Sequence, residues 1–328
     1  MTTRRTSSIA GALGTTIALS AMLAGCGGDA PLQGPTAPTA NPGRQTGAPI
    51  STGPIAFVST RDGSPHIYVA NADGSAPTRL TSGDSPAWSR DGRIAFQRSG
   101  QIFTMNADGS NVRGVGPGAS PDWSPDGTRL VFATRGGTGG IIVMNADGSG
   151  RTQLIGSEFL QQGDGVLTPV WSPDGQRIAF VRANWEEPRQ IYVMNADGSQ
   201  PRRLINGSIP SQSNPAWSPD GSTIIFESPF GIATVNANGS DWSGSGWNML
   251  NMKISRVFDP DWTADGRGFI FNTFTSSVGD STSSFGSRMR VFVAGLDGNA
   301  ERQLIPEAEA PALSNHWDDQ AVWARVNR

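Results

Sequence analysis

The chain has 328 residues, of which 42 are glycine, and a formal net charge of -3 at pH 7. This composition lacks the basic excess that a large nucleic-acid footprint needs, so we expect no nucleic-acid partner. A single cysteine excludes an internal disulfide, and the length suffices for a core larger than that of one small domain.

Residues 1–25 are predicted to be a lipoprotein signal peptide. Arg4 and Arg5 precede an apolar stretch over 9–24 that is too short to favour a permanent membrane span. The stretch ends in Leu23-Ala-Gly-Cys26, which resembles the lipobox of bacterial lipoproteins. The resemblance implies that Cys26 is acylated and becomes the new N-terminus. An ordinary secretory signal that ends near a cysteine is the alternative.

Residues 26–52 are predicted to be the acylated cysteine followed by a disordered tether. The segment is rich in proline, glycine and threonine and holds almost no large apolar side chain, so it cannot bury enough surface to order itself. We expect an exported protein that contacts the membrane through its lipid alone. Gly27 in place of an aspartate favours the outer membrane of a Gram-negative bacterium. The periplasmic and surface faces of that membrane stay alternatives.

From residue 53 to residue 328, two turn motifs alternate. The first reads Trp-Ser-Pro-Asp-Gly or a near-copy, and it begins at Trp88, Trp123, Trp171, Trp217 and Trp262, with a degenerate copy at Trp317. The second reads Asn-Ala-Asp-Gly-Ser, and it begins at Asn71, Asn106, Asn145, Asn195 and Asn236, with a weaker copy at Leu296. Repeats of about 45 residues with two hairpin turns are typical of propeller blades.

One repeat unit, residues 169–205, shows why each blade should have four strands. Short alternating runs bounded by turn residues predict strands at Pro169–Trp171, Arg177–Val181, Gln190–Met194 and Arg202–Ile205. A phenylalanine recurs in every second strand, and with the tryptophans it should pack between neighbouring blades. The expected fold is therefore all-β, a six-bladed propeller of four-stranded antiparallel blades.

The ring is expected to close when a C-terminal strand around Trp317 pairs with the N-terminal blade. Both Ile55–Val58 and Ala321–Val326 could supply the second strand of that closing blade. The pattern does not choose between them.

The repeated motifs resemble the six-bladed propeller of the TolB family over about residues 55–328. The same repeat also occurs in peptidase propellers and in stand-alone surface proteins. The family's namesake carries an α/β domain ahead of its propeller, where this sequence has a lipobox and a tether. Because of this departure, the resemblance leaves open whether the Tol–Pal partners of the namesake apply.

The hairpins of both motifs should emerge on one face, because a meander alternates strand direction. The other connections vary in length and share the opposite face, which makes that face the predicted site of recognition. Its candidate residues are Trp185, Glu186, Glu187, Trp242, Trp247 and Phe159. Exposed aromatic side chains suit protein or carbohydrate recognition, and the alternative is that these loops fold back over the blade edges.

The inner strands should line a central channel. Asp122, Asp261 and His316 occupy equivalent positions just before the first-strand tryptophans. Asp261 and His316 come from adjacent blades and could form a small polar or cation site near the axis. A solvated channel lining is the alternative.

The residue inventory argues against an enzyme. The chain has two histidines, lacks a Gly-x-Ser-x-Gly nucleophile motif and shows no helix-borne pair of metal-ligating histidines. We therefore expect no cofactor, no metal and no catalytic residue. The predicted function is a monomeric envelope scaffold that binds unidentified envelope proteins or a surface glycan. A carbohydrate- or small-ligand-binding propeller and a propeller hydrolase or lyase are the alternatives.

Overall fold

The computed structural model describes residues 53–59, 61–134, 139–161, 164–184, 187–205, 211–239, 248–250, 257–275, 288–296, 302–305 and 325–326. All of the described residues belong to one compact unit, Ala48–Arg328. The signal-peptide and tether predictions fall on residues 1–52, which lie outside this description.

The described part of the chain forms six antiparallel sheets of four strands each, which confirms the predicted six-bladed propeller. From its inner to its outer strand, blade 1 holds β24 (Arg325–Val326), β1 (Ile55–Ser59), β2 (His66–Ala70) and β3 (Thr78–Ser82). Blade 2, in the same order, holds β4 (Asp84–Trp88), β5 (Arg93–Arg98), β6 (Gln101–Asn106) and β7 (Arg113–Pro117). Blade 3 holds β8 (Ala119–Trp123), β9 (Arg129–Ala133), β10 (Ile141–Asn145) and β11 (Thr152–Ile155).

The remaining three blades follow the same order. Blade 4 holds β12 (Gly165–Trp171), β13 (Arg177–Ala183), β14 (Gln190–Asn195) and β15 (Arg202–Arg203). Blade 5 holds β16 (Ser213–Trp217), β17 (Thr223–Ser228), β18 (Gly231–Asn236) and β19 (Asn248–Met249). Blade 6 holds β20 (Val257–Trp262), β21 (Gly268–Thr275), β22 (Arg288–Gly295) and β23 (Arg302–Gln303).

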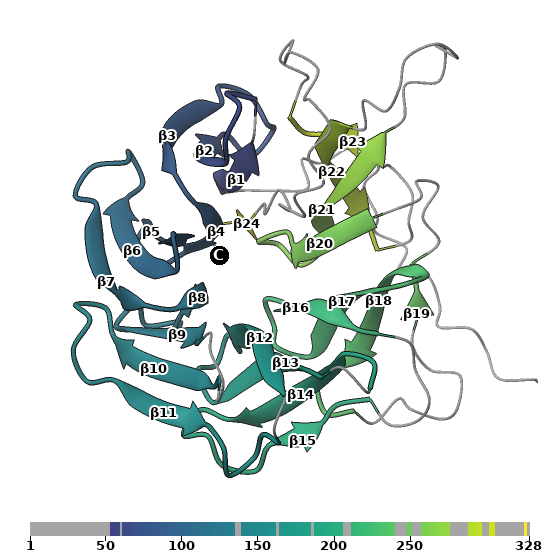
Figure 1. Ribbon diagram of the computed structural model, residues 1–328. Helices are drawn as coiled ribbons and strands as arrows, with labels where there is room; N and C mark the ends of the chain where they lie inside the picture. The colour runs from purple at the N-terminus through teal and green to yellow at the C-terminus, as the bar shows by residue number, and fades with distance from the viewer. Residues whose placement is uncertain are drawn as a thin grey trace, which may run out of the picture. The chain divides into compact units, whose positions relative to one another are not determined.

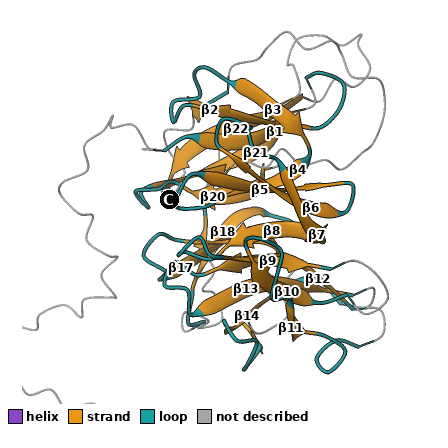
Figure 2. Cartoon of the chain, turned by 90° about the vertical axis from the view of Figure 1, so that its left-hand side faces the viewer, coloured by secondary structure: helices purple, strands orange, loops and turns teal. Residues whose placement is uncertain are grey.

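The inner strands lie around a common centre (Figure 1), and each contacts the inner strand of the next blade. In the side view the connections gather at the two ends of the sheets (Figure 2). Blade 1 also meets blade 6 at its outer turn, where a Cβ added to Gly74 would lie 1.7 Å from the carbonyl oxygen of Leu304. Gly239 of blade 5 approaches Leu204 of blade 4 in the same way, so the junction of blades 6 and 1 resembles the others.

Blade 1 combines strands from both ends of the propeller sequence. β24 pairs with β1, with Val326 opposite Ile55 and Arg325 opposite Ala56. In blade 2 the equivalent partners are Trp88 and Ile94. Ile55–Val58 therefore lies in the second strand, and Val326 takes the register position that a tryptophan holds in the other blades. Trp317, which the sequence suggested for that position, lies outside the described residues.

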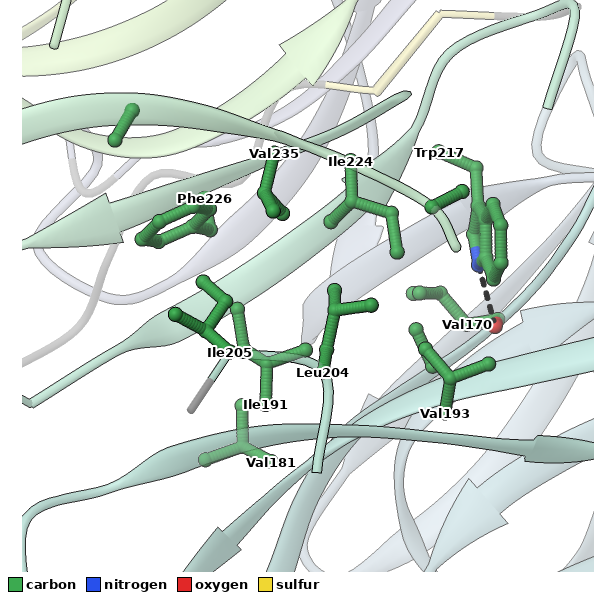
Figure 3. Close-up of a cluster of buried hydrophobic side chains, with 13 residues drawn as sticks. Val170, Val181, Ile191, Val193, Leu204, Ile205, Trp217, Ile224, Phe226 and Val235 are labelled. Carbon is green, nitrogen blue, oxygen red and sulfur yellow. Dashed lines mark hydrogen bonds between the residues drawn. The ribbon is translucent and has the colours of Figure 1, made fainter. Parts of the chain in front are cut away.

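The hydrophobic core lies between the blades. Figure 3 shows one cluster, in which Phe226 and Trp217 of blade 5 pack on Val181, Ile191 and Leu204 of blade 4. The six second-strand phenylalanines are at most 1% exposed, which confirms their predicted packing role: Phe57, Phe96, Phe132, Phe180, Phe226 and Phe271. Their side chains hold neighbouring sheets together and are not available as a ligand platform.

Five inner strands contain the same kink, three residues before the tryptophan. The kinked residue has a positive φ of 44–50° and precedes a proline; the five are Ser85, Ser120, Thr168, Asn214 and Asp259. At each of these residues the pairing with the second strand shifts register, as at a β-bulge. A positive φ in a residue other than glycine costs roughly 1–3 kcal/mol, and it often accompanies a binding site.

Candidate functional site

The two ends of the propeller differ in how their polar groups are used. We call the end that carries both repeated turns the turn face, and the opposite end the variable-loop face. On the turn face, Asn106 donates through Nδ2 to the Ser110 hydroxyl at 2.9 Å, and the Ser110 backbone N–H donates to Asp108 at 2.9 Å. The turns that begin at Asn71, Asn145 and Asn195 repeat both bonds. These polar side chains are therefore committed to holding the turns.

The same hydrogen bonds lower the pKa of the turn aspartates. The Ser110 hydroxyl and backbone N–H hold the pKa of the Asp108 carboxyl below its usual range. In the tryptophan turn of blade 3, the Ser124 hydroxyl, together with Thr128, lowers the pKa of Asp126 to about 2. These carboxylates stabilise the turns as anions.

We predict that acid destabilises the propeller through these turns. A carboxyl whose folded pKa is lowered contributes stability that is present above its unfolded pKa, about 3.9, and is lost as the pH falls through the folded value. The urea midpoint should therefore drop between about pH 4 and pH 2, the window set by Asp126. Asp126→Asn should flatten that drop. An unchanged midpoint across this window would show that the turn carboxylates contribute no net stability.

The variable-loop face carries the most exposed large hydrophobic side chain among the described residues. Phe230, in the turn between β17 and β18, is 66% exposed. Met249 in β19 and Leu167 near the start of β12 are each 38% exposed. All three lie toward the variable-loop end of their blades. Exposed apolar groups on a face of irregular loops are typical of a binding surface.

The structure describes two of the six loop residues predicted for recognition. Glu187 is exposed, and its backbone N–H donates to the side-chain oxygen of Asn184. Phe159 is half-buried, with its ring 5.6 Å from that of Tyr192 and 6.3 Å from that of Phe180. Its ring therefore packs on blade 4. Trp185, Glu186, Trp242 and Trp247 lie outside the described residues. The assignment of Trp242 and Trp247 to the variable-loop face was wrong, because β19 follows them as the fourth strand of blade 5 and their connection therefore starts and ends at the turn face.

An ion pair that the sequence analysis missed fixes the loop around Phe159. Asp164 accepts from Arg182 at 2.8 and 3.0 Å and from the backbone N–H of Gln161 at 2.8 Å. Burial alone would raise the pKa of Asp164, but the Gln161 N–H and the Arg182 guanidinium outweigh it and hold the pKa below its usual range. The side chains of Asp164 and Arg182 are 2% and 19% exposed. The pair thus ties the loop to β13.

The predicted channel residues have local hydrogen-bond partners. Asp122 accepts the backbone N–H of Trp171 at 2.8 Å, which joins blade 3 to blade 4. Asp261 is 4% exposed and accepts the N–H of Trp262 at 2.9 Å. His316 lies outside the described residues, so a site shared by Asp261 and His316 stays a prediction.

A polar cluster that the sequence analysis did not identify lies between blades 5 and 6. The Asn214 amide nitrogen donates to Glu227 at 3.0 Å and also to Asp259. Asn272 donates to Asp259 at 3.4 Å. Two of the kinked inner-strand residues, Asn214 and Asp259, therefore meet here. The sequence signal is a short polar residue before the inner-strand proline together with a polar residue after the second-strand phenylalanine.

Burial raises the pKa of Glu227, although Asn214, the backbone N–H of Asp259 and the positive charge of Arg189 oppose the shift.

The described residues contain no group of three or more His, Cys, Asp or Glu side chains placed to hold a metal ion. In the part of the chain that the structure describes, no helix has the length and apolarity to cross a membrane.

These features define a six-bladed β-propeller with a regular turn face and an irregular loop face. Residues 160–283, less than half of the chain, match the family model described as TolB beta propeller domain. The repeats are therefore TolB-like. No curated protein matches the sequence.

Solved structures share the fold. TolB from Acinetobacter baumannii matches with a TM-score of 0.61 and 20% identity over 78% of this chain and 64% of that one, just under two thirds of its length. A putative TolB from Agrobacterium tumefaciens matches with a TM-score of 0.56 and 20% identity over 77% of this chain and 88% of its own. Oligogalacturonate lyase from Vibrio parahaemolyticus gives a TM-score of 0.52 and 14% identity over 80% and 75%. Identities this low establish the fold alone.

Proposed function

We propose that this protein is a non-enzymatic scaffold that binds a protein partner through its variable-loop face. The observation that carries the proposal is the contrast between the two faces. Phe230 is 66% exposed on the variable-loop face, whereas the polar groups of the turn face are paired within their own turns. Aromatic anchors surrounded by polar loops are common at the centres of protein interfaces.

The proposed location is the cell envelope, with the chain exported and lipid-anchored at Cys26. The lipobox-like Leu23–Cys26 supports the anchor, and the segment 26–52 would give the propeller reach from the membrane. The TolB-like repeats support an envelope role. A Cys26→Ser variant should move the protein from the membrane fraction to the soluble fraction. Membrane retention of that variant would contradict the lipid anchor.

Partner binding can be tested by cross-linking and affinity capture from an envelope extract with the full chain as bait. Phe230→Ser should lose the captured partner. The matched control is Val112→Ser, because Val112 is 42% exposed and follows a repeated turn at the other face. Equal capture by both variants would contradict a role for the variable-loop face.

Carbohydrate binding is the second candidate, because Trp185, Trp242 and Trp247 stand outside the blade pattern. Trp185 lies between β13 and β14 on the variable-loop face, whereas Trp242 and Trp247 lie between β18 and β19, the connection that opens with the Asn236 turn. It predicts retention of the full chain on a glycan matrix. Retention should fall when these tryptophans become alanine and should persist in Phe230→Ser.

A further inference from the structure

The cluster of Asn214, Glu227, Asp259 and Asn272 adjoins the exposed apolar side chains of blade 5. Glu227 lies just before the turn that carries Phe230. A Cβ placed on Gly231, the next residue, would contact Met249 at 3.5 Å and Val257 of blade 6 at 3.7 Å. Phe230 and Met249 therefore lie close to the junction of blades 5 and 6. We call these two side chains and the polar cluster the blade 5–6 edge.

The blade 5–6 edge brings two carboxylates and two amides together, and the backbone N–H of Asp259 also acts on Glu227. The carboxylates of Glu227 and Asp259 share the amide of Asn214 as a donor. Asn272 is 0% exposed, its amide lies against Asp259, and its Oδ1 has no partner among the described residues. A buried acceptor without a donor costs about 1–3 kcal/mol. Within the cluster, the half-buried carboxylate of Glu227 is the acceptor that a ligand can reach.

The charge of the blade 5–6 edge also favours a ligand that supplies hydrogen-bond donors. Glu227 is half-buried, and none of the ion pairs found within the described residues involves it. Arg189 acts on it only through its electrostatic field. A half-buried carboxylate without an ion-pair partner destabilises the fold, and such groups concentrate at functional sites.

We propose that the blade 5–6 edge binds a basic side chain of a protein partner, with an adjacent apolar residue of that partner resting on Phe230 and Met249. The proposal rests on the proposed function and specifies the chemistry of its partner. An arginine guanidinium carries five donors and no acceptor, and it binds a carboxylate through two parallel hydrogen bonds. Glu227 is the accessible carboxylate, and the exposed ring of Phe230 supplies the apolar contact.

The Glu227→Gln variant has a defined effect on stability that makes it a usable probe. Because the folded pKa of Glu227 is raised, the ionised carboxylate is disfavoured in the fold once the pH exceeds the unfolded value. Glutamine keeps the acceptor for Asn214 and removes the charge. We therefore expect the urea midpoint of Glu227→Gln at pH 7 to equal or exceed that of the parent chain. A lower midpoint would show that the carboxylate stabilises the fold.

The binding test uses the full chain, immobilised, and a displayed library of random heptapeptides. Selected peptides should be enriched in Arg or Lys next to a large apolar residue. A selected peptide should bind Glu227→Gln and Phe230→Ser at least 10-fold more weakly. The charge-matched control is Asp108→Asn on the turn face, where Asn238 of the fifth repeat already shows that asparagine fits. This control should bind like the parent chain.

The outcomes separate the two proposals. Selection of peptides without basic residues, no selection at all, or equal binding by Glu227→Gln would overturn the proposed basic ligand. Peptides that depend on Phe230 but not on Glu227 would leave the variable-loop face as the binding surface and remove the blade 5–6 edge as its charged subsite. Retention of glycans instead of peptides would overturn both proposals.

Discussion

Trp217→Ala is expected to lower the free energy of unfolding by about 3–5 kcal/mol, the usual cost of deleting a buried aromatic side chain. Trp217 is 1% exposed and packs in the cluster that joins blades 4 and 5. Its Nε1–H donates to the carbonyl of Val170 at 3.3 Å (Figure 3), and the Arg177 guanidinium lies 4.7 Å from its ring centre. Urea unfolding followed by far-UV circular dichroism measures the loss.

A pair of phenylalanine variants isolates the hydrogen bond. Trp171 is buried like Trp217 and has Arg129 4.8 Å from its ring centre, but its Nε1 has no partner among the described residues. Trp217→Phe should therefore cost about 1–3 kcal/mol more than Trp171→Phe, because it breaks a buried hydrogen bond, whereas Trp171→Phe removes a buried N–H that had no partner among the described residues. Equal costs would show that the bond to Val170 contributes nothing to the junction.

Much of this architecture could be predicted because the repeat shows local turn chemistry many times. Asp-Gly turns bounded by alternating strands predict the positions of the second and third strands of a blade to within a few residues. The predicted strands Arg177–Val181 and Gln190–Met194 lie within the observed β13 and β14. The packing of the aromatic side chains could be predicted as well. A residue type that recurs in every blade is expected to pack at the junction that every blade forms with its neighbour.

The features that were missed depend on pairings between distant parts of the chain. The first strand predicted at Pro169–Trp171 extends back to Gly165, because the bulge at Thr168 lets the chain continue pairing beyond the proline. Asn214 meets Asp259, 45 residues away, only after two blades have packed together. Nothing in the sequence around Phe159 indicates that its ring will pack against Tyr192. A single sequence shows the repeat but not these contacts.

The two faces of the propeller could be told apart only by comparing the regular repeats with the segments that depart from them. The regular turns predicted which end of the propeller would be uniform, and the hydrogen bonds of Asp108 and its equivalents show why that end is uniform. The opposite end departs from the repeat, and Phe230 and Glu227 stand there at positions that no motif specified. Function is therefore better sought where the repeat is broken than where it is kept.

Asp164→Asn is expected to lower the free energy of unfolding by about 3 kcal/mol, the lower part of the range for breaking a buried ion pair, because Arg182 keeps partial contact with solvent. The substitution leaves the partly buried Arg182 guanidinium without its carboxylate. It also weakens the attachment of the segment that carries Phe159 and Leu160 to blade 4. Urea unfolding gives the energy, and limited proteolysis within residues 156–164 reports the local release.

A double variant separates the lost charge pair from general disruption of the loop. Arg182→Met keeps much of the apolar stem that lies near Phe159 and removes the guanidinium. In the combined variant no buried charge lacks a partner, so its cost should be smaller than the sum of the two single costs by about 1–3 kcal/mol. Additive costs would show that Asp164 and Arg182 stabilise the loop independently. A proteolysis rate unchanged in Asp164→Asn would show that packing of Phe159 alone holds the loop on blade 4.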